Sequence, residues 1–520
     1  MFALDQVRGG EREVIGIRLG QNRLRGLHWN VASGLVSSGW SAIASLLVLP
    51  FYLRVLGAEN FGLISFFTSL QGALLLLDLG FSTTMNREVA RSQSTDSTYA
   101  PRLLRTLELL YWLTAILIGV CFLAIAPLVA RSWFSSNQLS AGTITSSLRL
   151  MAVLMTLRWP VGLYLGAITG AGRASWVNFL TIIVTSLSTV GAVLVLMFIE
   201  PSLRCFLLWQ IIVSLLQVVA ARYLSWHALG HRERVASDFT LVPPLFGFSS
   251  QIAAATLLGV IVAQLDKLIL PRFVSLDEVG KFGVAFLVSR LLITLISPVY
   301  SAFYPHLTAL IAGDGSNEVA TAYRLYSRIA NAILFSTAAY IAVFGVDIIT
   351  VWTGDQALAL HLHVVLPLLV AGSALNASMY FPHALQLARG DSNAAVLVNL
   401  VMFATLVPTL AILLPGYGIE GAAIAWFLSN VANVAASILL THRRGFQVSA
   451  RLWLVTDFLL PMLTALLPAL IGFQLLAVLP SIVARLGWGL LMPTLSSLAI
   501  VFTVPALRHR ARAVLLRRQS

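Results

Sequence analysis

The sequence predicts an all-α polytopic membrane protein with about 14 transmembrane helices, and three observations support this class. Hydrophobic residues make up 58% of the chain and charged residues only 11%, whereas soluble domains carry about 25% charged residues. Apolar runs of about 20 residues follow one another, and each is long enough to cross a hydrocarbon core of about 30 Å. Spaced identities also indicate that the chain is duplicated.

The duplication is clearest in a motif that recurs 221 residues later. Leu49-Pro50 followed by Phe61-Gly62 matches Leu270-Pro271 followed by Phe282-Gly283. Single identities keep nearly the same offset: Trp133 with Trp352, Pro160 with Pro382, Asn178 with Asn399, and Trp209 with Trp426. Each repeat holds six spans, an even number, so both halves enter the membrane in one orientation. We therefore expect two six-helix bundles related by a pseudo-two-fold axis along the membrane normal, with a substrate path between them.

The individual spans follow from the apolar runs, and two of them lie beyond the repeat. They are predicted near residues 31–53, 61–82, 107–130, 148–169, 176–198, 204–226, 245–270, 282–304, 328–350, 362–386, 394–414, 419–441, 453–476 and 482–505. The predicted domains are a basic cytoplasmic arm (1–28), an N-terminal bundle (29–234), a C-terminal bundle (235–444), two extra transmembrane helices (445–507) and a basic cytoplasmic tail (508–520).

The basic residues predict the orientation. Of the 34 lysines and arginines, 24 lie in the arm, the tail and the loops on the same side as the termini. Cytoplasmic loops carry such an excess, so both termini are expected in the cytoplasm. The net charge of +13 is explained by this bias. No stripe of basic and aromatic residues supports a nucleic-acid partner.

The short connections between spans and the absence of catalytic and nucleotide-binding motifs argue against an enzyme. No loop is long enough for a soluble catalytic domain, and no P-loop, GxSxG or HExxH motif occurs. The histidines show no metal-ligand spacing, so neither a metal nor another cofactor is expected. The chain is therefore predicted not to be an enzyme, and any energy for transport must come from a gradient or the membrane potential.

Ionisable residues inside spans are costly, so they usually face a bundle interior or a watery cavity. Arg158 lies near the middle of its span beside Pro160, where the missing backbone hydrogen bond should bend the helix. Pro382 occupies the matching point of the second half, with Tyr380 in the position of Arg158. The paired breaks point to a substrate path. The alternative is that both prolines only kink their helices for packing, and that Arg158 donates hydrogen bonds to the backbone carbonyl groups that the kink leaves free.

Two further cations lie within spans of the second half. Arg290 is about 12 Å from the outer end of its span by helical rise, too deep for easy snorkelling, so we expect it to bind substrate or to pair with Asp266. Lys267 could bind substrate or simply snorkel. Asp266, its neighbour, is expected to act as a counter-ion.

Acidic residues are fewer at these depths. Asp78 and Arg87, near the cytoplasmic end of the second span, could form a polar gate, or an interfacial ion pair and a helix cap. Arg158, Lys267 and Arg290 outnumber Asp78 and Asp266, and this balance favours an anionic ligand such as a phosphate or pyrophosphate.

The stretch LPFYLRVLGAENFGLISFF followed by LLDLGFSTTMNREVAR resembles the opening of the O-antigen and exopolysaccharide flippases. These belong to the multidrug/oligosaccharidyl-lipid/polysaccharide exporter (MOP) superfamily. The resemblance implies alternating access around a central cationic cavity in the bacterial inner membrane. It also implies an undecaprenyl-pyrophosphate-linked oligosaccharide as substrate, moved from the cytoplasmic to the periplasmic leaflet, with the polyprenyl tail in lipid along the last two spans.

Other functions stay open at this point. A cation-coupled multidrug or small-molecule exporter of the same superfamily would need acidic residues to dominate the cavity. A non-transporting membrane component of a glycan-assembly pathway would need a closed, apolar centre. Proton or sodium exchange, or the membrane potential acting on the anion, would drive transport. A polymerase and other glycan-assembly proteins are candidate partners, besides membrane lipid.

Overall fold

The computed structural model is helical throughout its described part. It describes residues 29–30, 32–74, 78, 80–92, 98–230, 235–313, 316–442, 448–476 and 481–503. The predicted arm (1–28) and tail (508–520) lie outside these residues. Within them, the only β pairing is an isolated bridge between Ser135 and Ser275. The all-α class is therefore confirmed.

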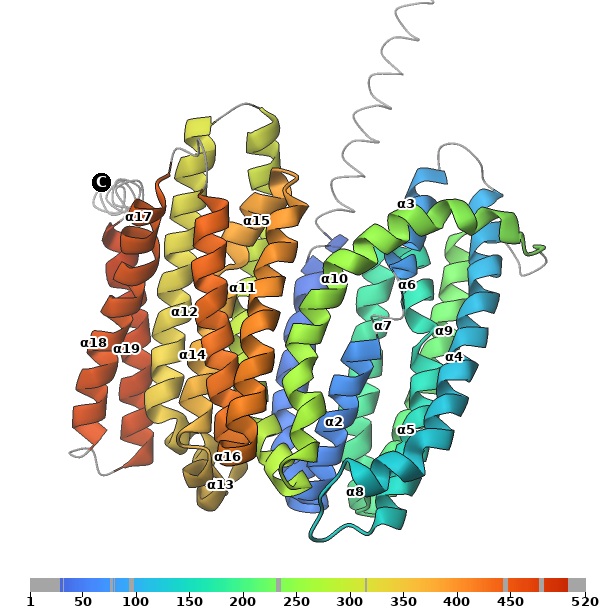
Figure 1. Cartoon of the computed structure of the whole chain (residues 1–520), viewed down its shortest axis with the longest axis horizontal. Helices are drawn as coiled ribbons and strands as arrows, with labels where there is room; N and C mark the ends of the chain where they lie inside the picture. Colours follow the sequence, from blue (N-terminus) through green and yellow to red (C-terminus); the bar gives the residue numbers. More distant parts are fainter. Residues whose placement is uncertain are drawn as a thin grey trace, which may run out of the picture. The chain divides into compact units, whose positions relative to one another are not determined.

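The predicted spans lie on helices, which Figure 1 shows in sequence colours. The first half holds a first helix (Ala32–Leu56), α2 (Ala58–Leu74), α3 (Phe81–Ser92), α4 (Tyr99–Ser132), α5 (Ala141–Arg158), α6 (Val161–Gly170), α7 (Ala174–Ser186), η2 (Leu187–Gly191), α8 (Ala192–Phe198) and α9 (Leu203–Ala228). The second half holds η3 (Phe239–Leu241), α10 (Pro243–Ile269), η4 (Leu270–Arg272), α11 (Leu276–Ala312), α12 (Ser316–Thr353), α13 (Gln356–His361), α14 (Val365–Ser378), α15 (Tyr380–Ala388) and α16 (Ser392–Thr441). The C-terminal part holds α17 (Ala450–Trp453), η5 (Leu454–Leu459), α18 (Leu460–Leu476) and α19 (Ile482–Thr503). Among the described residues, ten helices are long and apolar enough to cross a membrane.

The chain forms two compact units. Unit 1 comprises residues 1–48, 78–126 and 146–250, and unit 2 comprises residues 49–77, 127–145 and 251–520. The first helix, α4, α5 and α10 each contribute residues to both units. The buried apolar core of unit 2 draws on α10 to α12 and α14 to α18.

The two copies of the repeated motif pack against each other in unit 2, where α2 contacts α11. A Cβ added at Gly62 would meet the carbonyl oxygen of Leu276, and one added at Gly280 would meet that of Ala58. The glycines therefore allow two helix backbones to approach closely, as small residues do in membrane helix pairs. Gly283 in turn lies against α2 at Ser65. The repeated motif of each half thus contributes to the contact between α2 and α11.

Each half contains a span that is interrupted at or near its proline. Arg158 ends α5, and α6 starts after Pro160, whose φ and ψ are −71° and −13°. In the second half, α14 and α15 are separated at Met379, with φ and ψ of −80° and −1°. The bend expected from Pro160 is present, and the second break precedes Pro382 by three residues. This places Tyr380 in the first turn of α15.

Two predicted spans, 394–414 and 419–441, together form α16. A straight helix of its 50 residues would be about 75 Å long, more than twice the hydrocarbon thickness. Gly418 interrupts it with a φ of 52° and a ψ of −130°, a conformation open mainly to glycine. The backbone of Leu413 lies against Gly421, so the chain folds back here and the two segments run side by side (Figure 1).

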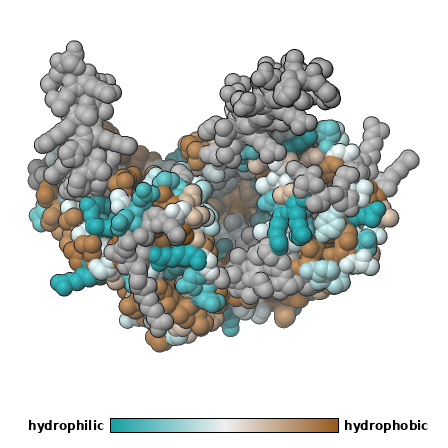
Figure 2. Space-filling view, turned by 90° about the horizontal axis from the view of Figure 1, so that it is seen from above, coloured by the Kyte–Doolittle hydropathy of each residue, from teal (hydrophilic) through white to brown (hydrophobic). Residues whose placement is uncertain are grey.

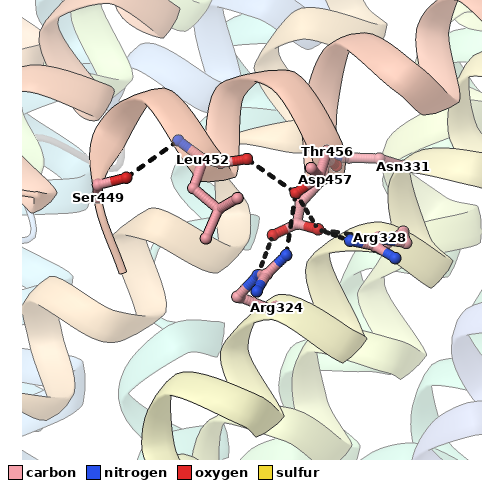
Figure 3. A network of polar contacts seen from close by, with 7 residues as sticks. All are labelled: Arg324, Arg328, Asn331, Ser449, Leu452, Thr456 and Asp457. Atoms are coloured by element: carbon pink, nitrogen blue, oxygen red, sulfur yellow. Dashed lines mark hydrogen bonds and ion pairs between the residues drawn. The ribbon is translucent and has the colours of Figure 1, made fainter. Parts of the chain in front are cut away.

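The two extra helices, α18 and α19, pack on α12. Figure 3 shows the polar contacts that join the start of this pair to α12. Asp457 in η5 is fully buried and forms ion pairs with Arg324 at 2.9 Å and Arg328 at 2.6 Å. Farther along α12, Asp347 pairs with Arg485 of α19 at 3.3 Å. The appended helices are thus held at two points along one helix.

The surface has the character of a membrane protein. Many large apolar side chains are exposed, for example Leu117 at 63% on α4, Phe198 at 78% on α8 and Leu467 at 61% on α18. Hydrophilic residues gather on the helix ends that face the viewer in Figure 2, next to hydrophobic residues. Exposed apolar side chains along the helices suit contact with lipid rather than water.

Candidate functional site

Unit 2 contains a cavity of about 310 Å³ between α10, α11, α14, α15 and both segments of α16. Its volume is at the lower end of the range typical of ligand pockets. The break between α14 and α15 and the fold-back of α16 at Gly418 together shape its walls. The sequence predicted the break near this place.

Arg290 is the cation of this cavity. It lines the wall with Phe286 and Ile293, which share one face of α11 because they are four and three residues away. Its guanidinium carbon lies 5.7 Å from the centre of the Phe286 ring. Among the described residues its guanidinium group makes no ion pair or hydrogen bond, and the residue is exposed. Its charge is therefore available to a ligand.

α15 brings Tyr380, His383 and Gln386 to the same cavity, at the helical spacing that places them near one another. The Gln386 amide donates to the hydroxyl of Thr441 at 2.8 Å. Pro382 is buried in the core and is not a lining residue. Its place in the structure is within α15, after the break.

The remaining polar lining is neutral. Amide side chains dominate it, and Asn376 donates to Asn430 at 2.8 Å. Trp426 donates to the hydroxyl of Ser373 at 3.4 Å. The described lining residues include one arginine, one histidine, three aromatic residues and four amides, and no carboxylate: Arg290, His383, Phe286, Tyr380, Trp426, Asn376, Gln386, Asn399 and Asn433. Such a set suits a ligand that carries an oxyanion together with many hydroxyl groups.

Lys267 lies behind this lining and is almost fully buried. Its ammonium group contacts the carboxylate of Asp266 at 2.8 Å and the carbonyl of Ala263 at 2.6 Å. It also lies 3.9 Å from the centre of the Phe286 ring, so Phe286 contacts both cations. Asp266 is the counter-ion of Lys267, and its second oxygen, Oδ2, has no hydrogen-bond partner among the described residues. The structure thus brings Lys267 and Arg290 together around the Phe286 ring, with Asp266 paired to Lys267.

Arg158 belongs to unit 1 and has polar partners on α9. Its Nε donates to the Ser214 hydroxyl at 2.9 Å and a terminal nitrogen donates to the Gln210 carbonyl at 3.0 Å. Gln210 in turn donates to the backbone of Ser188 in the π-helical segment η2. These bonds tie the break after α5 to its neighbours. They resemble the alternative in which Arg158 has a structural role, except that in them Arg158 donates to the Ser214 and Gln210 side chains and not to backbone carbonyls freed by Pro160.

Asp78 and Arg87 also lie in unit 1. The Asp78 carboxylate accepts from the Tyr111 hydroxyl at 2.5 Å and from the hydroxyl of Ser82 at 2.7 Å. It also accepts from the backbone of Ser82 in the first turn of α3 at 3.3 Å. Asp78 therefore holds the start of α3 against α4. Arg87 is exposed on α3.

Sequence reasoning missed a buried ion network in unit 1. Glu108 on α4 is 3% exposed and pairs with Arg222 of α9 at 2.5 Å and with Arg105 at 3.2 Å. The hydroxyl of Tyr164 on α6 donates to it at 2.7 Å. The signal that could have found the network was an acidic residue inside an apolar run.

The four amides of the cavity and His383 were missed as well. Amides occur in many spans, where helix-to-helix hydrogen bonding explains them. Only the folded arrangement gathers these particular ones around Arg290.

Comparisons with known proteins agree with the architecture. A family model described as polysaccharide biosynthesis protein matches residues 27–311. No curated protein sequence matches the chain.

Among solved structures, the lipid II flippase MurJ in an inward closed conformation is similar, with a TM-score of 0.63 at 11% identity over 92% of this chain and 98% of that chain. An inward-facing multidrug resistance MATE family transporter of the MOP superfamily has a TM-score of 0.62 at 15% identity, over 78% of this chain and 92% of that one. A MOP superfamily transporter from Pyrococcus furiosus, described as having a binding pocket of reverse polarity, has a TM-score of 0.56 at 16% identity, over 79% and 93% of the two chains. At these identities the likeness establishes the fold.

Proposed function

Because the chain belongs to the polysaccharide biosynthesis protein family and has the fold of MOP superfamily transporters, we propose that it translocates a lipid-linked oligosaccharide across the membrane. The substrate class is an undecaprenyl-pyrophosphate-linked oligosaccharide, moved from the cytoplasmic to the periplasmic leaflet of the bacterial inner membrane. The observation that carries this proposal is the cavity of unit 2, where Arg290 faces neutral polar and aromatic residues without a carboxylate among the described lining residues.

The chemistry of this lining supports the proposal. A guanidinium group binds phosphate oxygens in pairs, and Arg290 has no competing carboxylate partner in the described part of the chain. Amides donate to and accept from sugar hydroxyls, and the rings of Tyr380 and Trp426 offer apolar faces to sugar rings. Lys267 adds positive potential from behind Phe286, although its pairing with Asp266 offsets part of this charge.

The cation-exporter alternative has less support. Asp266 is fully buried against Lys267, and Asp78 accepts hydrogen bonds from Tyr111 and Ser82, so neither carboxylate lines this cavity. Proton exchange, sodium exchange and the membrane potential are all compatible energy sources. Related MOP folds have been solved in inward-facing and outward-facing conformations, which supports alternating access for this chain.

The experiment is leaflet-resolved accumulation of lipid-linked oligosaccharide in cells that lack this protein but keep polymerase and ligase. We expect accumulation on the cytoplasmic leaflet, relieved by the intact protein and not by Arg290→Gln. Arg272→Gln is the matched control, because Arg272 is an exposed arginine of the same unit outside the cavity. It should restore export fully at equal protein levels.

Two results would contradict the proposal. If Arg290→Gln restores export as well as Arg272→Gln does, the cavity is not the anion site. If glycan reaches the periplasm normally without the protein, and no second flippase is found, the flippase function is wrong. Drug-efflux assays would then test the exporter alternative.

A further inference from the structure

Unit 1 has an apolar groove that the proposed transport function does not use. Its volume is about 810 Å³, and the first helix, α7 and α9 form its walls. Trp29, Phe179 and Tyr223 line it and are 65–68% exposed. Its described lining holds no charged side chain. An elongated apolar ligand fits this surface.

The walls of the groove are held in place by hydrogen bonds between the first helix and α7. The Asn30 side chain accepts from the backbone of Ser175 at 3.0 Å, and Asn178 donates to the Ser33 hydroxyl at 2.9 Å. Farther along, Trp40 donates to the hydroxyl of Ser186 at 2.9 Å. The pairs advance together along both helices, so the helices run parallel and the groove between them is preformed.

At one end of the groove, Arg173 lies over a stack of three aromatic side chains. The guanidinium carbon of Arg173 lies 4.2 Å from the centre of the Trp176 ring. Trp176 stacks on His227 at 5.7 Å, and His227 stacks on Tyr223 at 6.1 Å. Among the described residues, Arg173 has no carboxylate partner. Tryptophan and tyrosine are the residues that favour the membrane–water interface, so this end marks the headgroup level.

We propose that this groove binds an anionic membrane phospholipid, with one acyl chain between the first helix and α7 and its phosphate at Arg173. From Trp29 to Val36 the groove follows the first helix for about 10 Å, a depth that takes the upper part of an acyl chain. The positive charge at the mouth and the apolar interior match the two parts of such a lipid. Under the predicted orientation, this lipid lies in the cytoplasmic leaflet.

Charge also selects the lipid over the chain's own N-terminal segment. Residues 1–28 contain five arginines and three acidic residues, so the segment carries a net positive charge. Arg173 would repel this segment. An anionic headgroup, in contrast, is attracted both by Arg173 and by the positively charged segment.

The test is native mass spectrometry of the full purified chain with dioleoyl phosphatidylglycerol or dioleoyl phosphatidylcholine. One arginine near an anionic headgroup should favour phosphatidylglycerol about fivefold. Arg173→Gln should remove this preference, and Arg173→Lys should keep it. Arg204→Gln, at an exposed arginine on α9, should change nothing.

A second pair of variants tests the groove itself. Ala220→Trp places a large ring in the groove and should abolish retention of both lipids. Val219→Trp, at a neighbouring residue that is 58% exposed and does not line the groove, should retain them. Melting temperatures of all variants establish that they are folded.

Three outcomes would overturn the proposal. The first is equal retention of the two lipids by the unchanged protein. The second is displacement of phosphatidylglycerol by equimolar undecaprenyl phosphate, which would assign the groove to the carrier lipid. The third is displacement by a peptide of residues 1–28, which would assign it to the chain's own segment. None of these outcomes depends on glycan export, so the proposed function is tested separately.

Discussion

Arg158 and Arg290 both lie within spans, but their side chains have different surroundings. Arg158 donates to Ser214 and Gln210, whereas Arg290 is exposed to the cavity and has only the Phe286 ring as a partner among the described residues. A cation that is already hydrogen-bonded stabilises its helix contacts. One that faces a cavity without a partner can exchange water for a ligand.

This difference predicts that only the loss of Arg158 lowers stability. Arg158→Leu should lower the melting temperature in detergent, because each buried polar group left without its partner costs about 1–3 kcal/mol. Arg290→Leu should melt close to the unchanged protein while losing glycan export. If Arg158→Leu melts normally and also loses export, Arg158 contacts substrate, as its place beside Pro160 first indicated.

At the scale of elements, α12 is the platform for the appended helices. Arg324 and Arg328 lie one turn apart on α12 and share the carboxylate of Asp457, to which the Thr456 hydroxyl also donates (Figure 3). The side chain of Asn331 donates to the backbone oxygen of Asp457 at 2.7 Å. The side-chain carboxylate and the backbone carbonyl of Asp457 are thus both bonded to α12. These bonds fix the start of α18.

We predict that Asp457→Ala destabilises the protein by about 3–5 kcal/mol, because it leaves the largely buried Arg328 without its counter-ion. Arg485→Ala breaks the more exposed pair with Asp347, for which we expect a loss of about 1 kcal/mol at most. The measurement is the unfolding free energy in mixed micelles by denaturant titration. Equal losses for the two variants would show that burial of Asp457 is not the decisive factor.

At the scale of the whole molecule, the duplicated plan and the basic loops together predict sidedness. Six spans per repeat and two appended spans give an even total, so both termini lie on one side. The excess of lysine and arginine places that side in the cytoplasm. This remains a prediction, and the lipid site at Arg173 follows the same orientation.

Topology reporters test it. A green fluorescent protein fused after Ser520 should fluoresce, because it folds in the cytoplasm. Alkaline phosphatase inserted at Pro201, in the connection between α8 and α9, should be active, because this loop lies on the opposite side. An active phosphatase at the C-terminus would reverse the orientation of the whole chain.

The sequence by itself determined the helical membrane class, the repeat and the presence of a break near each of the two prolines. These depend on local quantities: the length of an apolar run, the spacing of identical residues and the missing amide hydrogen of proline. Each can be found without knowing what the residue touches. The close approach of Gly62 to α11 involves this motif as well, because Gly62 and its counterpart Gly283 are the glycines that the repeat identifies.

Only the tertiary structure decided which polar residues act together. The surroundings of Arg158, Arg290 and Glu108 depend on residues more than 50 positions away, such as Gln210, Trp426 and Arg222. From the sequence, an arginine inside an apolar run carries the same expected free-energy cost whether its side chain contacts a hydroxyl group, a carboxylate or an open cavity. Packing of distant helices chooses among these, and that choice separates a structural cation from one that can bind a ligand.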